Sequence, residues 1–207
     1  MTNSDSINAQ DTDPRQGCEA ALATFRRVAE SIGPDDLSKP TPCDDMNVGQ
    51  LLGHTVGAAG RLAAAGRGDD PNAVDLEPAI DPNGYVAAVD AVTGEVRSAW
   101  ADPARLGEVV TLPFAQMPGA MAVGMYTAEI LIHSWDLAAA AQLNIDWPDP
   151  VVLAALAGMQ MALPDEIRSD PEVPFDRVVD VPSTAPAIER LVAWTGRNPA
   201  AWPTTTS

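Results

Sequence analysis

Apolar side chains recur every three or four residues along most of this chain, which is the period of α-helices that bury one face. This period dominates from residue 16 to residue 163. Its first segment places Phe25, Val28 and Ile32 on one stripe and ends before a helix-breaking Gly-Pro pair. The pattern therefore predicts a first helix that ends near residue 32.

Two further helices are marked by the residues that begin them. Asn47 stands three residues before Gln50 at the start of an apolar run, which is the arrangement of a capping box, and this run ends near Gly66. Asp81 followed by Pro82 is typical of an N-cap and a first helical residue. The sequence therefore predicts a second helix from residue 47 and a third from residue 81.

A fourth helix differs from the others because it is apolar on nearly every side. It is predicted to follow residues 106–118, an apolar stretch broken by Pro113 and Pro118 that we expect to be an irregular crossing or a short extended piece. The fourth helix should extend from about Gly119 to about Leu143. Burial on most of its faces predicts that it is the central helix.

The last part of the chain mixes helical and extended signals. Asp149 and the proline after it predict a fifth helix that ends at Leu163, and Ser183 or Thr184 is expected to begin a short final helix. Residues 173–181 between them have the composition of a strand or a hairpin arm. The fold class is therefore predicted to be all-α.

These elements divide the chain into three parts. Residues 1–16 are polar and acidic and are predicted to form a flexible tail, residues 17–163 a helical body, and residues 164–207 a C-terminal extension that packs on it. At 207 residues the chain is long enough to bury one core.

Charge and composition exclude several classes of function. The formal net charge is −17, which repels nucleic-acid phosphates and anionic lipid, so we expect neither a nucleic-acid nor a membrane partner. No stretch resembles a membrane span or a secretory signal, and the cytoplasm is the expected location. In that reducing compartment, Cys18 and Cys43 are expected as thiols rather than as a disulfide.

The candidate chemistry lies around the two histidines of the chain, each of which stands among apolar residues of a predicted helix. His54 belongs to the second helix and His133 to the fourth. Glu129, His133 and Asp136 are spaced by four and three residues, which places three ionisable groups on one face of the most apolar helix. A buried charge must be paired or bound to a ligand.

One interpretation is a metal site in which His54, Glu129 and His133 bind a Zn²⁺-like ion and Asp136 holds a histidine N–H behind it. Three protein ligands leave one position for water or substrate. The alternative is a core histidine paired with neighbouring acids. Cys43 is either a fourth ligand or a packing residue of the loop before the second helix. No glycine-rich phosphate-binding loop is present in the sequence.

Three segments of the sequence resemble one known family. They are TPCDDMNVGQLLGH at residues 41–54, EILIHSWDLA from Glu129, and ERLVAWTGRNP from Glu189. Together they are similar to the DinB-like proteins related to mycothiol-dependent maleylpyruvate isomerase, and in particular to an actinobacterial stand-alone subgroup that binds metal. The resemblance covers nearly the whole chain.

The resemblance implies a DinB-like four-helix bundle with a short C-terminal appendage, a homodimer, and a divalent metal held by His54, Glu129 and His133. Zinc is the expected metal, with nickel, iron or manganese as alternatives. The implied activity is that of a thiol transferase or isomerase in which the metal activates a small thiol such as mycothiol for attack on a small electrophile, with Asp136 as a supporting residue or base. Two other functions stay open: a hydrolase that uses metal-bound water, and a non-catalytic metal-binding protein.

Overall fold

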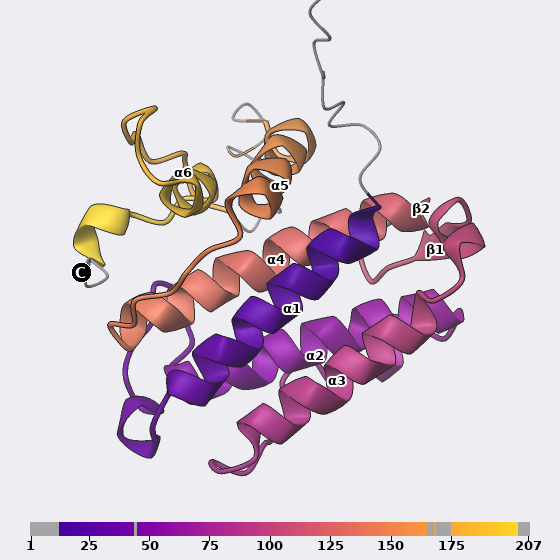
Figure 1. The fold of residues 1–207 in the computed structure, drawn as a ribbon, viewed down its shortest axis with the longest axis horizontal. Helices are drawn as coiled ribbons and strands as arrows, with labels where there is room; N and C mark the ends of the chain where they lie inside the picture. Colours follow the sequence, from indigo (N-terminus) through magenta and orange to yellow (C-terminus); the bar gives the residue numbers. More distant parts are fainter. Residues whose placement is uncertain (1–12, 44, 165–167, 169–174, 203–207) are drawn as a thin grey trace, which may run out of the picture.

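Four long helices form a bundle, and two shorter helices lie on one side of it (Figure 1). The structure is a computed structural model that describes residues 13–43, 45–164, 168 and 175–202. The elements are α1 (Pro14–Ser31), α2 (Val48–Arg67), α3 (Tyr85–Ala99), β1 (Val109–Thr111), β2 (Gln116–Pro118), α4 (Gly119–Ala140), α5 (Asp149–Ala162) and α6 (Ala187–Trp194). The predicted all-α class is confirmed.

The helices of the bundle do not simply alternate in direction. The end of α2 and the start of α4 both approach Trp100, through Gly66 and Gly119, so these two neighbouring helices are antiparallel. The start of α2 meets the start of α3 where Gly49 approaches Tyr85, and α2 and α3 are therefore parallel. A parallel pair needs a connection that runs back the full length of the helix.

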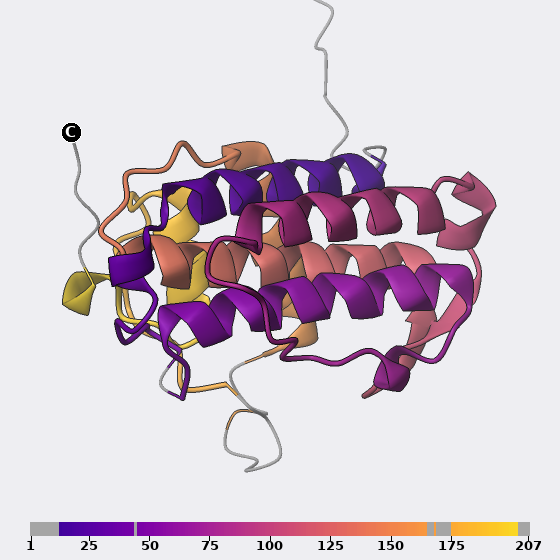
Figure 2. The ribbon, with the colours of Figure 1, turned by 90° about the horizontal axis from the view of Figure 1, so that it is seen from below.

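Residues 68–84 make that connection as an irregular strap along α2 (Figure 2). Gly68, in a left-handed conformation with φ of 82°, ends α2 and starts the strap. The strap then lies directly on α2, where Gly57 meets the backbone of Leu76 and Gly53 meets the carbonyl oxygen of Pro78. Glycine is required on this face because a Cβ atom would occupy the space of the strap.

Substitution of Gly57 by alanine is expected to destabilise the fold by about 2 kcal/mol, since its Cβ atom would overlap the carbonyl of Leu76. The matched control is Gly124→Ala on α4, where a Cβ atom meets nothing within 4 Å, and where alanine should stabilise the helix by about 0.5–1 kcal/mol. Urea denaturation followed by circular dichroism measures both values. Equal stabilities for the two variants would contradict the close packing of the strap.

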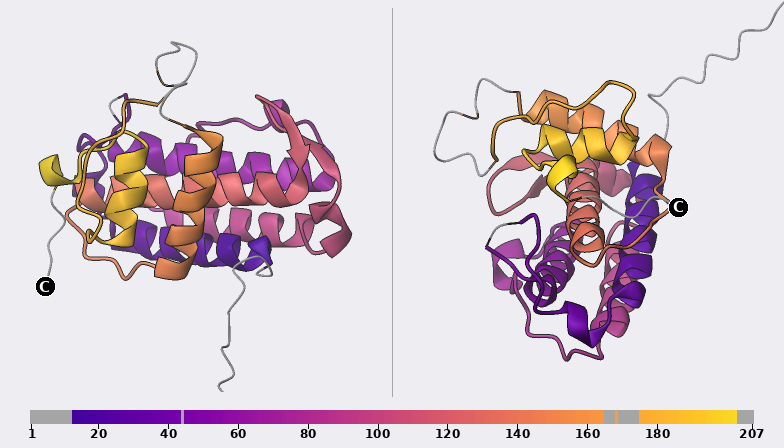
Figure 3. Two further views of the ribbon diagram at one scale, coloured as in Figure 1. Left: turned by 90° about the horizontal axis from the view of Figure 1, so that it is seen from above. Right: turned by 90° about the vertical axis from the view of Figure 1, so that its left-hand side faces the viewer.

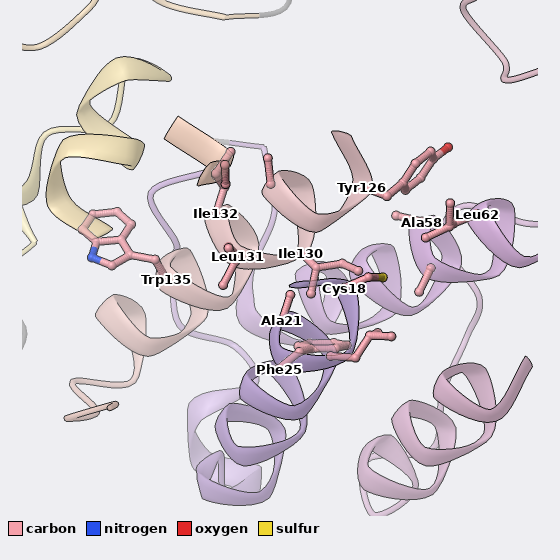
Figure 4. Packing of buried hydrophobic residues seen from close by; sticks show 14 of the residues in the cluster. Cys18, Ala21, Phe25, Ala58, Leu62, Tyr126, Ile130, Leu131, Ile132 and Trp135 are labelled. Atoms are coloured by element: carbon pink, nitrogen blue, oxygen red, sulfur yellow. The ribbon is translucent and has the colours of Figure 1, made fainter. Parts of the chain in front are cut away.

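The core is organised around α4, as its apolar sequence predicts. Ile130, Leu131 and Trp135 of this helix are buried, and Phe25 of α1 packs into the same cluster (Figure 4). The indole of Trp100 closes one end by donating a hydrogen bond to the Leu62 carbonyl at 3.0 Å. Because α1 and α2 both pack on α4, polar side chains of α4 that face α2 are held in place by a rigid apolar surround.

Helices α5 and α6 pack against each other and cross the outer side of α4 at a steep angle (Figure 3). Their buried contacts include Val152 and Leu156 from α5 and Leu191 and Val192 from α6. This arrangement covers a side of α4 on which neither α1 nor α2 packs. It also explains why α4 is apolar nearly all round.

Several predicted boundaries are confirmed and others shift. Asn47 and Gln50 form the expected capping box, and α5 begins at Asp149. Helix α1 begins at Pro14, inside the predicted tail of residues 1–16, because Asp13 accepts a hydrogen bond from the backbone N–H of Arg15. Helix α4 ends at Ala140, three residues before the predicted end.

Two local predictions are wrong, and a third is confirmed in one of its two forms. Asp81 does not cap α3: its carboxylate accepts from the N–H of Asn83 in a separate turn, and the helix begins at Tyr85. The stretch 106–118 contains short extended pieces, as one of the two expectations had it, and they pair as an antiparallel hairpin in which Val110 lies opposite Met117. Of the predicted strand at 173–181, residues 175–181 are irregular and residues 173 and 174 lie outside the described part.

The final helix, α6, begins at Ala187 instead of Ser183 or Thr184, since the chain forms a turn first, in which Ala185 donates to the Pro182 carbonyl. Cys18 and Cys43 are not joined by a disulfide, as expected. Among the described residues, no helix combines the length and the apolar character that a membrane crossing requires.

Candidate functional site

His54, Glu129 and His133 meet between α2 and α4. Oε1 of Glu129 lies 3.1 Å from Nε2 of His133 and 3.6 Å from Nε2 of His54. The two imidazole rings stand edge to face, with their centroids 5.1 Å apart. His54 is at least 75 positions away from Glu129 and His133 in the sequence, yet the three residues present their ligand atoms to one point.

The local sequence explains this convergence. The capping box at Asn47 fixes where α2 begins, and His54 follows two turns later on the side that faces α4. Glu129 and His133 are four residues apart, so their side chains lie one above the other on α4. Antiparallel packing of the two helices then brings the single histidine of α2 opposite the pair on α4.

The site is buried on one side and accessible on the other. The side chain of His133 is 7% exposed and that of His54 13%, whereas the side chain of Glu129 is 34% exposed. Glu129 is therefore the member of the cluster that solvent reaches most readily, while the histidines are largely buried. The two buried histidines therefore form the inner side of the site, and the exposed part of Glu129 forms its outer side.

Charge interactions shift the acid–base equilibria of the cluster. Burial works against the charge of Glu129, but His133 and His54 outweigh it, and the pKa of Glu129 is lowered. Burial also works against a charged His133, but Glu129 and Asp136 outweigh it and raise its pKa to about 9. In the absence of a bound cation, the imidazolium of His133 provides the positive charge that the two carboxylates require.

Asp136 lies behind His133 and is fully buried. Its Oδ2 atom is 3.0 Å from Nδ1 of His133, and since a carboxylate can only accept, Nδ1 carries the proton. This contact orients the ring and directs Nε2 toward Glu129, as the sequence analysis anticipated for an acid one turn beyond the histidine.

Arg197 compensates the charge of Asp136 and had no assigned role in the sequence analysis. Its Nη2 atom donates to Oδ2 of Asp136 at 3.1 Å and its Nε atom to Oδ1 at 3.3 Å. Gly196, with φ of 91°, makes a turn after α6 that brings the arginine back toward α4. The only sequence signal was the Gly-Arg pair after the last helix, which does not reveal a partner 61 residues away.

Cys43 also lies near the site. One ligand atom each from Cys43, His133 and Asp136 falls within 4.8 Å of the other two, so these residues form a second group with metal-ligand chemistry. His133 is common to both groups. The loop position of Cys43 is set by Thr41, whose hydroxyl accepts from the Cys43 N–H at 3.1 Å.

The donor set of His54, Glu129 and His133 fits a divalent cation. Two ligands about 2.0–2.1 Å from a tetrahedral ion are separated by about 3.4 Å, and the measured Glu129 contacts of 3.1 and 3.6 Å bracket this value. Imidazole nitrogens and a carboxylate oxygen are ligands that Zn²⁺ accepts. In the described part of the chain, Nδ1 of His54 is buried without a hydrogen-bond partner, and it is Nε2 that faces Glu129.

Without metal, stability should decrease as the pH rises from about 6.5 to about 9. His133 has a raised pKa in the folded state, so its contribution is complete below the unfolded value near 6.5 and is lost as the pH passes through about 9. The expected loss is on the order of 3 kcal/mol. Urea denaturation in the presence of a chelator measures it. A stability that stays level over this range, or the same slope in His133→Gln, would contradict the ion-pair assignment.

Comparison with known proteins relates this geometry to a family. Residues 18–138 match the family model described as the mycothiol maleylpyruvate isomerase N-terminal domain. The match contains α2 and all three residues of the cluster, and it ends two residues after Asp136.

Two curated proteins of Mycobacterium tuberculosis are similar along most of the chain. They are Uncharacterized protein MT0763 of strain CDC 1551 and Uncharacterized protein Rv0738 of strain H37Rv. Each is 29% identical over 188 residues, a match that covers 89% of this chain and 98% of theirs. A match of this length extends beyond the helical body into the C-terminal extension that begins at residue 164.

Among solved structures, the crystal structure of a histidine-to-alanine mutant of mycothiol-dependent maleylpyruvate isomerase matches with a TM-score of 0.56 and 11% sequence identity. The match covers 82% of this chain and 75% of that one, and it confirms the DinB-like fold expected from the sequence. Since the family model spans more than half of the chain, the protein belongs to the mycothiol maleylpyruvate isomerase N-terminal domain family.

Proposed function

We propose that the protein holds a divalent metal ion through Nε2 of His54, a carboxylate oxygen of Glu129 and Nε2 of His133. The observation that supports this most strongly is the approach of both imidazoles to one oxygen of Glu129. Zinc fits best because the set is compact and mixes nitrogen and oxygen ligands. Nickel, iron and manganese accept the same donors, and elemental analysis of protein purified without chelator distinguishes the four metals.

We further propose that the protein is a thiol-dependent transferase or isomerase, with a mycothiol-type thiol as cosubstrate. Membership of the family and the name of the structural relative support this class. A divalent cation, when bound, supplies a positive charge that lowers the pKa of a thiol in contact with it. The thiolate would then add to a small electrophile.

The chain's own residues have separate tasks in this proposal. His54 and His133 present neutral Nε2 atoms, and Asp136 keeps the proton of His133 on Nδ1 so that Nε2 stays available. Arg197 neutralises Asp136 and so prevents a second uncompensated carboxylate beside Glu129. The exposed side of Glu129 leaves space for the thiol and the electrophile.

A closed, non-catalytic metal site is the second candidate, because Cys43, His133 and Asp136 could hold the ion instead. Two contacts argue against it. Asp136 already accepts hydrogen bonds from Arg197, and His133 Nδ1 is occupied by Asp136. A cation at this position would have to displace the Arg197 guanidinium, whose charge repels it. The hydrolase alternative has no observation of its own in its favour.

An assay of zinc-loaded protein with mycothiol tests the function directly. We expect consumption of electrophiles, with maleylpyruvate as the first compound to try, only when both thiol and metal are present. Chelation should abolish the reaction and added zinc should restore it. Turnover that continues without any thiol would contradict the proposal and would favour hydrolysis by bound water.

A further inference from the structure

Arg61 has no ionic partner among the described residues of this strongly acidic protein. Acidic residues outnumber Lys and Arg by 29 to 12, and most arginines on the bundle pair with a carboxylate, as Arg26 does with Asp90. Arg61 is partly buried on α2, and among the described residues no carboxylate lies within ion-pair distance of it. An unpaired arginine near a candidate active site suggests that its partner is a ligand.

The contacts of Arg61 leave most of its donors available. Nε donates to the carbonyl oxygen of Val74 in the strap at 3.3 Å, which anchors the side chain. The carboxylate of the neighbouring residue Asp75 accepts a hydrogen bond from the backbone N–H of Glu77 and does not pair with Arg61. Both terminal nitrogens of the guanidinium are therefore left without a hydrogen-bond partner in the part of the chain that the structure describes.

Arg61 lies on the same side of α2 as His54, seven residues later, which is close to two full turns or about 10 Å along the axis. On α4, Tyr126 precedes Glu129 by one turn. Because α2 and α4 are antiparallel, these two steps run in the same direction from the metal cluster. Arg61 and Tyr126 therefore lie on the same side of the metal cluster along the axis of the helix pair.

Tyr126 supplies a second donor at this position. Its ring lies beside Ala58 and Leu62 of α2, with the hydroxyl directed away from the core (Figure 4). Burial raises its pKa to about 12, the charge of Glu129 adds to this effect, and the charge of Arg61 opposes it. The hydroxyl is consequently protonated at neutral pH, and it has no hydrogen-bond partner among the described residues.

We propose that Arg61 and Tyr126 form a carboxylate-binding subsite beside the His54, Glu129 and His133 cluster, and that it holds the carboxylate of the electrophilic substrate. A guanidinium and a hydroxyl match the two oxygens of a carboxylate. One cation balances the single negative charge of one carboxylate group, whereas a phosphate dianion would concentrate two negative charges on one group next to Glu129. The identity of the ligand as the electrophile rests on the proposed function, but anion binding at Arg61 does not.

Succinate binding, measured by isothermal titration calorimetry, tests the subsite in both chelator-treated and zinc-loaded protein. We expect saturable binding that weakens about tenfold or more both in Arg61→Gln and in Tyr126→Phe, because each variant loses a charge-assisted hydrogen bond to the carboxylate. Arg61→Lys should fall between Arg61→Gln and the unaltered protein. Neutral succinamide should not bind.

The matched control is Arg27→Gln, which removes one positive charge from the exposed surface of α1 and should leave succinate binding unchanged. Three results would overturn the subsite: equal affinity in Arg61→Gln, an equal loss in Arg27→Gln, or tighter binding of inorganic phosphate than of succinate. Zinc content is measured in the same samples. Protein that binds succinate but no zinc refutes the metal site alone, and protein that binds zinc but no succinate refutes the subsite alone.

Discussion

Replacement of His133 by alanine is expected to reduce zinc affinity more than about 100-fold and to lower the free energy of unfolding of the metal-free protein by about 3 kcal/mol. The variant loses one of three proposed ligands. It also removes the buried group that lies 3.1 Å from Glu129 and 3.0 Å from Asp136. Two carboxylates are then left with fewer compensating charges. Elemental analysis of protein purified without chelator, together with urea denaturation, measures both effects.

Cys43→Ala is the control for this experiment. Cys43 belongs only to the second group with ligand chemistry, so its loss should leave zinc content unchanged if His54, Glu129 and His133 hold the ion. The removal of a small, partly exposed side chain should cost about 1 kcal/mol or less. Equal metal loss in the two variants would indicate a closed site with a cysteine ligand, and the thiol-transferase proposal would then have to be abandoned.

Replacement of Arg197 by leucine is expected to destabilise the protein by about 3–5 kcal/mol, the cost of leaving a buried carboxylate without its cation. Asp136 is fully buried, and among the described residues it would keep only His133 as an ionic partner. Since the contact that orients His133 would then no longer be shared with Arg197, zinc affinity should change as well. Thermal and urea denaturation measure the loss of stability.

Arg97→Leu is the matched control, because Arg97 pairs with Glu19 on the surface, where the two side chains are 63% and 43% exposed. Surface pairs of this kind contribute about 0–1 kcal/mol. If Arg197→Leu costs no more than Arg97→Leu, the contact between the C-terminal segment and α4 does not stabilise the site.

The helical bundle could be predicted because its information is local. The apolar period of α4, the capping box at Asn47 and the proline after Asp149 each act within a few residues. His54, Glu129 and His133 could be grouped for a related reason: charged or polar groups on apolar helix faces need partners, and few candidates existed in the chain.

What the sequence did not reveal depends on contacts between distant segments. Arg197 finds Asp136 only through the turn at Gly196 and the packing of α5 and α6 on α4. The hairpin from β1 to β2 forms although prolines interrupt the stretch, because Pro118 lies at the very end of β2, where it pairs with Val109. The strap was also not predicted. The glycines of α2 leave space for a neighbouring segment, but they do not identify the segment that packs there.

The central claim, that one divalent ion binds between α2 and α4, is tested most directly by anomalous diffraction at the zinc edge from crystals of zinc-loaded protein. The account predicts one peak about 2.0–2.2 Å from Nε2 of His54, Nε2 of His133 and a carboxylate oxygen of Glu129, with a further position open to solvent. Two results would contradict this claim: a peak within bonding distance of Cys43, His133 and Asp136, or the absence of a peak between His54, Glu129 and His133.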